Sequence, residues 1–172
     1  MSHGPGDGSR GSGGGVGWPV LLLAVLLIAL IAAGTYTGLE WNKARAEQER
    51  RDDVLDAARA EALAFTTLDY KTVDADIATV LAGATGSFKN QFEASKGQVK
   101  ELTTEAESVS RGKILEAGLV AADNDSATVI LVADSTVTNV NSESPQPRHY
   151  RIQMDLALVK DRWLTSDLQF VG

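Results

Sequence analysis

The sequence predicts an α+β domain that follows one apolar segment long enough to cross a membrane. Three observations support this prediction. Residues 18–39 contain no charged side chain. Between residue 40 and Thr104 apolar side chains recur every three or four positions, as on helices, whereas after Thr104 they recur every second position, as on strands. Helices followed by a run of strands are typical of an α+β domain, here of about 130 residues.

The first 17 residues form a glycine-rich tail. Eight of the 16 glycines of the chain lie within it. A Gly/Ser segment buries too little apolar surface to offset the entropy lost on ordering, so we expect residues 1–17 to be disordered.

Residues 18–39 have the composition of a transmembrane helix. Most are Leu, Ala, Val or Ile, and Trp18 and Trp41 flank them as interfacial aromatic residues do. As a helix this segment would extend about 33 Å, enough for a bilayer core of about 30 Å. Two alternatives are a buried core helix and a signal peptide cleaved near the small residues 32–34. The length and uniformity of the segment favour an uncleaved single-pass anchor.

The charges around this segment leave its orientation open. Arg10 is the only basic side chain before it, whereas Lys43, Arg45, Arg50 and Arg51 follow. The positive-inside rule therefore favours a cytoplasmic carboxyl-terminal domain, but long domains translocate largely regardless of charge.

A helix is predicted to continue from the anchor over residues 40–69. Its first part carries opposite charges four positions apart, so we expect residues 40–60 to form a solvated helical stalk. The α+β domain is predicted to occupy residues 61–172. The apolar stripe that leads into this domain comprises Leu55, Ala58, Ala62 and Phe65.

Two further helices are predicted before the strands. The first has Thr72 as its N-cap, Asp74 and Asp76 in its first turn, and an end at Gly83 or Gly86. Its apolar face comprises Val73, Ile77, Val80, Leu81 and Ala84. The second starts at Ser87, and its apolar face comprises Phe88, Phe92, Ser95, Val99 and Leu102.

Four strands are predicted after the helices. The first two cover residues 114–121 and 128–140, and a loop with two prolines separates them from the third. The third strand places Tyr150, Ile152, Met154, Leu156 and Leu158 on one face. In the last strand, residues 163–171, we expect Leu164, Leu168 and Phe170 to face the core. Strands with one polar face are typical of an antiparallel sheet with helices on its other side.

Charge and composition exclude several function classes. The net charge is −7, which argues against nucleic acid as a partner, because phosphate binding requires a surplus of Lys and Arg. The chain has no cysteine, which excludes disulfides, thiolate metal sites and cysteine nucleophiles.

His149 is the only histidine beyond the tail. It could act as a general base or a metal ligand, but it starts a strand on the polar face and has no evident partner in the sequence. A surface role is the better interpretation.

Other candidate residues also favour structural roles. Asp74 and Asp76 are two positions apart and point away from each other on a helix. Asp123 and Asp125 suggest a turn, because the calcium-binding loop pattern is absent. The segment 83–86 follows a helix rather than a strand, unlike a phosphate-binding loop. We therefore assign no catalytic, cofactor-binding or metal-ligating residue.

The aromatic side chains Phe65, Phe88, Phe92 and Trp163 fall on predicted apolar faces. We expect them to belong to the core, and some of them to line a cavity if the helices and a curved sheet form a cone.

Residues 64–92 and the end of the chain carry a family resemblance. The segments Phe65 to Tyr70, Ala84 to Phe88 and Trp163 to Val171, placed after one apolar span and a charged helix, resemble the actinobacterial Mce-associated membrane proteins, the "mammalian cell entry" accessory family. The resemblance implies a cone-shaped fold related to nuclear transport factor 2 and SnoaL-like domains. It also implies a plasma-membrane protein with a cytoplasmic amino terminus and an extracytoplasmic domain.

The same resemblance implies a non-catalytic accessory or stabilising subunit of an Mce-type lipid-import complex. Its expected partners are other subunits of that complex, the membrane through residues 18–39, and an apolar or lipid ligand, with no cofactor. One alternative is a membrane-anchored assembly scaffold of a secretion system. Another, less favoured, is a small-molecule enzyme on the SnoaL-like fold.

Overall fold

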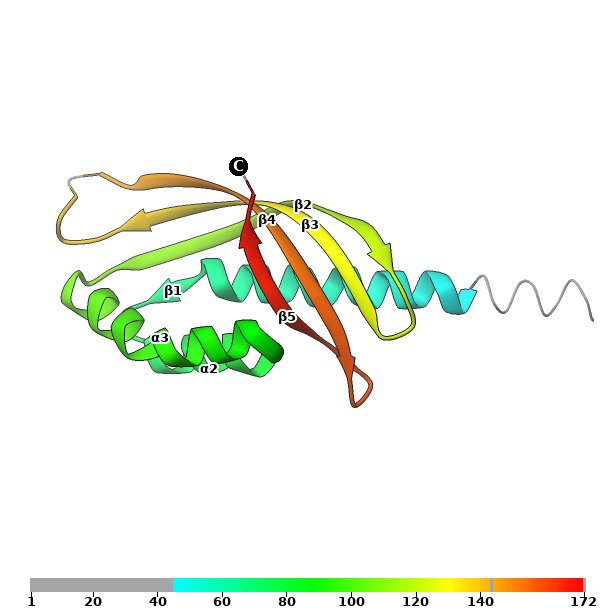
Figure 1. Cartoon of the computed structure of the whole chain (residues 1–172). Coiled ribbons are helices and arrows are strands. Elements are labelled where there is room, and N and C mark those ends of the chain that lie inside the picture. Colours follow the sequence, from blue (N-terminus) through cyan, green and yellow to red (C-terminus); the bar gives the residue numbers. More distant parts are fainter. Residues whose placement is uncertain (1–44, 143, 172) are drawn as a thin grey trace, which may run out of the picture. The chain divides into compact units, whose positions relative to one another are not determined.

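The computed structural model describes residues 45–142 and 144–171, and these form one long helix, two shorter helices and a five-stranded antiparallel sheet (Figure 1). Glu47 marks the start of the compact unit that contains the sheet. None of the helices in the described ranges is long and apolar enough to span a membrane. The predicted tail, residues 1–17, and the predicted anchor, residues 18–39, lie outside those ranges.

The long helix, described over residues 45–66, packs one face against the sheet. Val54, Ala58 and Ala62 are fully buried, and their spacing of four residues places them on one side of the helix. Leu55 and Phe65 of the predicted stripe are partly buried against the two apolar clusters of the core. The segment predicted as a stalk, residues 40–60, therefore contributes side chains to the domain core.

The long helix was predicted to reach residue 69, and this is wrong. It ends at Thr66, and the next residues form the short strand β1 (Leu68–Asp69), which pairs with β2. The Thr66 hydroxyl donates to the carbonyl of Ala62 at 2.7 Å. A side chain on Gly112 of β2 would collide with the Thr66 side chain, so the missing Cβ lets the strand approach the helix end.

Helices α2 (Val73–Gly83) and α3 (Gly86–Glu105) follow, close to their predicted positions. Both pack on Phe65 through buried apolar side chains, namely Val73, Ile77, Val80, Phe88 and Phe92. Leu102, which we predicted on the buried face of α3, is instead 58% exposed.

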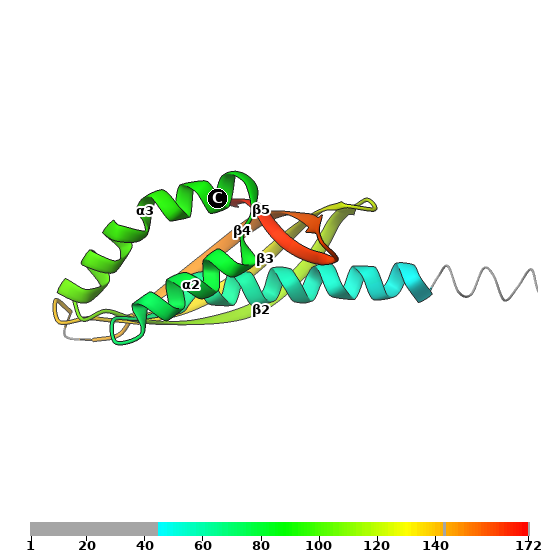
Figure 2. The same ribbon diagram turned by 90° about the horizontal axis from the view of Figure 1, so that it is seen from below.

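The sheet is a meander of five antiparallel strands in the order β1-β2-β3-β4-β5. The four longer strands are β2 (Val109–Ala122), β3 (Ser126–Thr138), β4 (Gln146–Val159) and β5 (Arg162–Phe170). The sheet curls, and the three helices lie on one side of it in both views (Figures 1 and 2). The predicted class, an α+β domain with helices on a curved antiparallel sheet, is therefore confirmed for the described part of the chain.

Strand β4 confirms the predicted alternation in its central part, whereas Leu158, predicted on the same face, is 36% exposed at the end of the strand. Ile152, Met154 and Leu156 are at most 2% exposed, and they form one core cluster with residues of β3 and of the long helix. Gln153, on the opposite face, is partly exposed and pairs across the sheet with Ile130.

Strand β2 departs from simple alternation because its pairing with β3 shifts register twice. The shifts lie between Ile114 and Glu116 and between Leu119 and Ala121. Each inserts an extra residue that is left on the solvent side. Leu115 is consequently 43% exposed and Val120 59% exposed.

Strand β5 corrects another prediction. Leu168 packs on the core as expected, but Leu164 pairs with Ala157 on the outer face. Phe170 faces inward as predicted, since it pairs with Ile152 and its ring lies 6.1 Å from that of Phe65, although it is still 58% exposed. Thr165, which pairs with Leu156, takes the inward position and is 1% exposed. The pairing of β4 with β5 shifts register between Asp155 and Leu156. As a result, odd-numbered residues such as Thr165 face inward at the start of β5, and even-numbered residues such as Leu168 face inward at its end.

Candidate functional site

Glu61 is a buried carboxylic acid on the face of the long helix that looks toward α2. Its residue is only 5% exposed, although it follows a charged and solvated stretch of helix. The Oε1 atom has no hydrogen-bond partner within the described residues. A buried polar atom without a partner is costly, and in native proteins it usually has a specific reason.

Gly83, the last residue of α2, makes room for this carboxyl group. A side chain at this position would collide with Oε2 of Glu61. The long helix and the end of α2 can therefore approach each other closely at Glu61, because the facing residue of α2 is a glycine.

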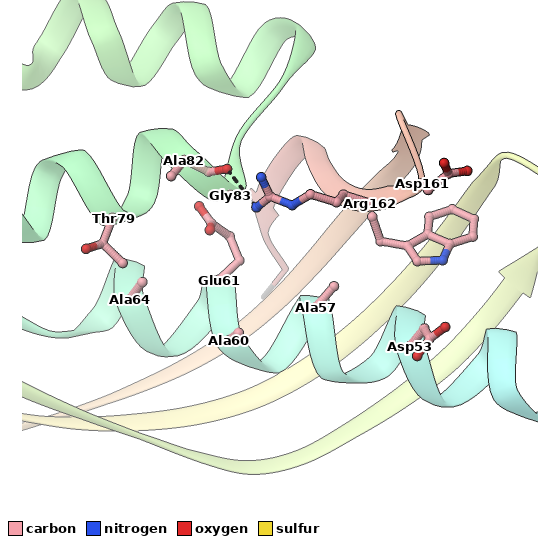
Figure 3. A pocket seen from close by; sticks show the side chains of 11 residues that line it. Asp53, Ala57, Ala60, Glu61, Ala64, Thr79, Ala82, Gly83, Asp161 and Arg162 are labelled. Carbon is pink, nitrogen blue, oxygen red and sulfur yellow. Dashed lines mark hydrogen bonds between the residues drawn. The ribbon is translucent and has the colours of Figure 1, made fainter.

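A pocket of about 550 Å³ opens beside Glu61, between the long helix, α2 and the turn from β4 to β5 (Figure 3). Figure 3 shows the carboxyl group of Glu61 and the guanidinium of Arg162 both directed toward the end of α2. The lining residues are Asp53, Ala57, Ala60, Glu61, Ala64, Thr79, Ala82, Gly83, Asp161, Arg162 and Trp163.

Arg162 does not neutralise Glu61. Its Nη2 atom donates to the carbonyl of Ala82 at 3.4 Å. The ion pairs found in residues 45–142 and 144–171 do not include one between these two side chains. Asp53 and Asp161 add two more carboxylates to the lining, so acidic groups outnumber basic ones around the pocket.

Burial raises the pKa of the Glu61 carboxyl from 4.5 to about 8, because removal from water disfavours the charged form. At pH 7 the group is therefore mostly protonated in the absence of a cation. A perturbed carboxyl group in a cleft is a candidate functional group, for proton exchange or for pairing with a cation.

A second hollow, of about 630 Å³, shares Ala60, Ala64 and Thr79 with the first. It is mainly apolar and includes Leu63, which is 43% exposed, and Gly112 of β2.

His149 has a partner that the sequence did not reveal. Its Nδ1 atom lies 2.7 Å from Oδ1 of Asp134, the residue that pairs with it across β3 and β4. The His149 side chain is 76% exposed, so the pair is a surface interaction. Neither residue lies beside Glu61, since they line a different hollow on the outer face of the sheet.

The four aspartates considered in the sequence have structural contacts. Asp74 pairs with Lys100 at 2.8 Å and thereby links α2 to α3, while Asp76 accepts hydrogen bonds from the Asp69 backbone N–H and the Thr72 hydroxyl. Thr72 makes no side-chain cap to the α2 backbone. Asp123 and Asp125 lie at the turn between β2 and β3, where the Asp123 N–H donates to Ser126.

The segment 83–86 connects α2 to α3, with Gly86 at a φ of +55°. In the described part of the chain, no three acidic or histidine side chains lie close enough to hold a metal ion. Sequence reasoning missed Glu61. The available signal was its position, one residue before Ala62 and three after Ala58 in a helix whose neighbouring positions are apolar.

Comparison with solved structures shows where this fold recurs. An IcmL-like type IV secretion system protein from Legionella pneumophila matches with a TM-score of 0.59 and 13% identity, over 70% of this chain and 91% of that one. CagV, a VirB8 homologue of the type IV secretion system of Helicobacter pylori strain 26695, matches with a TM-score of 0.57 and 8% identity, over 70% of this chain and 98% of that one. At these identities the similarity concerns the fold.

Sequence comparison identifies a closer group. The "Uncharacterized protein Rv1363c" of Mycobacterium tuberculosis (strain ATCC 25618 / H37Rv) is 23% identical over 159 residues, which are 89% of this chain and 61% of that relative. This chain thus spans less than two thirds of the relative's length. The family model described as "Uncharacterized protein Rv1363c/MT1408-like" matches residues 19–172. The chain belongs to the Rv1363c/MT1408-like family.

Proposed function

We propose that this protein is a membrane-anchored subunit that helps to assemble or stabilise a multiprotein complex of the cell envelope, and that it acts by association rather than catalysis. The observation that carries the proposal is the shared fold. The domain matches type IV secretion components over 91% and 98% of their own chains. The fold match to proteins of type IV secretion systems supports a role within a multiprotein envelope complex.

The predicted anchor explains how a modest interface could suffice. Residues 18–39 would hold the domain in the same membrane as its partners. Tethering raises the effective concentration of the partner, so overall binding can exceed the affinity of the isolated contact by orders of magnitude.

The domain also exposes apolar side chains that an association could remove from water. Leu115, Val120 and Ile130 of the neighbouring strands β2 and β3 are 43%, 59% and 42% exposed. Association driven by burial of such side chains needs no catalytic group.

Two kinds of complex fit the proposal. The fold similarity favours a secretion-type assembly. The resemblance of residues 64–92 and 163–171 to Mce-associated membrane proteins favours a lipid-import complex of the Mce type, in which this chain would be an accessory subunit. Both hypotheses involve an anchored domain that acts by association, and they differ only in the proteins that this domain contacts.

We further propose that the domain lies outside the cytoplasm. A reporter that is active only after export, fused after Gly172, is expected to be active. A reporter that is active only in the cytoplasm is expected to be silent at the same position. The opposite pattern would place the domain in the cytoplasm, as the count of Lys and Arg beside the anchor favours.

Deletion of the protein tests association against catalysis. We expect deletion to lower the abundance of the partner complex in the membrane, as measured by quantitative mass spectrometry, because a stabilising subunit is lost. His149→Ala, which alters an exposed surface pair, is expected to leave that abundance and the activity of the complex unchanged. If His149→Ala abolishes activity while protein levels stay normal, a catalytic role must replace the proposed one.

A further inference from the structure

The strongest unexplained feature of the domain is the carboxyl group of Glu61. The residue is 5% exposed and its Oε1 atom has no hydrogen-bond partner within the described residues, yet it borders an open pocket. A carboxylate buried without a partner is unfavourable unless a cation or a hydrogen-bond donor reaches it. The carboxyl group packs against Gly83 through Oε2, and Glu61 is one of the residues that line this pocket.

The other charged side chains that line the pocket determine whether it favours a cationic or an anionic ligand. Asp53 and Asp161 contribute further negative charge. The single cationic side chain, Arg162, is directed to the carbonyl of Ala82 and forms no ion pair with Glu61 in the described structure. The local potential therefore favours a cation and disfavours an anion.

The apolar part of the lining determines the shape of the ligand. Ala57, Ala60 and Ala64 form a wall of small side chains along the long helix, and Trp163 adds an aromatic surface. Small side chains leave room for an alkyl stem, and an indole ring attracts a cation that lies over its face.

We propose that this pocket binds a primary ammonium group on a short apolar stem, with Glu61 as its counter-ion. A free alkylamine and a lysine side chain share this chemistry. The ammonium group would supply the hydrogen-bond donor that the Glu61 carboxyl group lacks in the described structure, in a charge-assisted hydrogen bond. The inference does not depend on the proposed function, because binding at this pocket is separate from association with an envelope complex.

Proton exchange provides an independent signature. Because burial raises the pKa of Glu61 to about 8, binding of an ammonium ion at pH 6–7 requires release of the Glu61 proton. Binding should therefore tighten as the pH rises toward about 8. The other charged groups that line the pocket are Asp53, Asp161 and Arg162.

The test is calorimetric titration of the full-length chain with n-butylammonium chloride, in buffers free of primary amines. We expect one binding site and proton release at pH 6.5, detected by comparing buffers of different ionisation enthalpy. Glu61→Gln is expected to weaken binding at least tenfold and to abolish proton release. The matched control is Glu49→Gln, which changes an exposed carboxylate of the same helix and should leave binding unchanged. The neutral isostere 1-butanol should not compete.

A second titration, with Nα-acetyl-lysine methylamide, distinguishes the sources of the ammonium group. Binding of comparable strength would indicate that a lysine side chain fits the pocket, whereas binding of n-butylammonium alone would indicate a small amine. Equal binding to wild type and to a folded Glu61→Gln variant, equal binding of 1-butanol, or no binding of either amine would overturn the proposal.

Discussion

Leu156→Ala is expected to lower the free energy of unfolding of the domain by about 2–5 kcal/mol, because it creates a cavity in the centre of the core. Leu156 is 2% exposed and belongs to the cluster in which β4 packs on β3 and on the long helix. Urea denaturation of the full-length chain, followed by far-UV circular dichroism, measures the loss.

The matched control is Gln153→Ala on the opposite face of the same strand. Gln153 is partly exposed and makes no core contact of this kind, so its removal should change the free energy of unfolding by less than about 1 kcal/mol. Coincident denaturation midpoints for the two variants would show that the register of β4 is wrong, since a shift of one residue exchanges the faces of a strand.

Glu61 is expected to make the domain less stable as the pH rises. The pKa of its carboxyl is raised in the folded state to about 8 from 4.5. Between these values the unfolded chain loses the Glu61 proton while the folded chain keeps it, so the free energy of unfolding falls with increasing pH. Below pH 4.5 and above about pH 8 this group adds no further slope. The total loss from this group is at most roughly 5 kcal/mol.

Glu61→Gln removes the titrating group. We expect the variant to gain stability relative to wild type as the pH rises from 4.5 to 8, when urea midpoints are compared in buffers without primary amines. Glu49→Gln, on the exposed side of the same helix, should follow the wild-type pH profile. Parallel profiles for wild type and Glu61→Gln would show that the Glu61 carboxyl is solvated and that its pKa is ordinary.

The regular parts of this fold could be predicted from the sequence because their periodicity is uninterrupted. Ile152, Met154 and Leu156 alternate without exception, and each is buried as predicted. Helix α2 ends at Gly83 as its glycine indicates. In both cases local sequence and tertiary packing favour the same structure.

The irregular parts depend on pairing between strands that the sequence does not specify locally. The extra residues Leu115 and Val120 are apolar and look like ordinary strand residues, so nothing in the sequence reveals that the register shifts there. Strand β1 has two residues, too few for any periodicity, and it forms only because β2 lies beside it.

The candidate site was hidden for the same reason. Glu61 follows a charged stretch of helix and reads as one more solvated carboxylate. Its burial depends on Gly83, 22 residues later in the chain, and on the turn that carries Arg162. Likewise, the contact between His149 and Asp134 depends on the β3–β4 register, which brings together residues 15 positions apart.

We propose above that the anchored domain works by association with an envelope complex. The most direct measurement is affinity purification of the full-length chain from cross-linked native membranes, followed by quantitative mass spectrometry. A parallel sample carries a cleavable signal peptide in place of residues 18–39. Under this proposal we expect the anchored chain to recover several subunits of one envelope complex, of the secretion or the Mce type, and the released domain to recover them in much smaller amounts. An anchored chain that is recovered alone, or a released domain that retains the same subunits equally well, would contradict it.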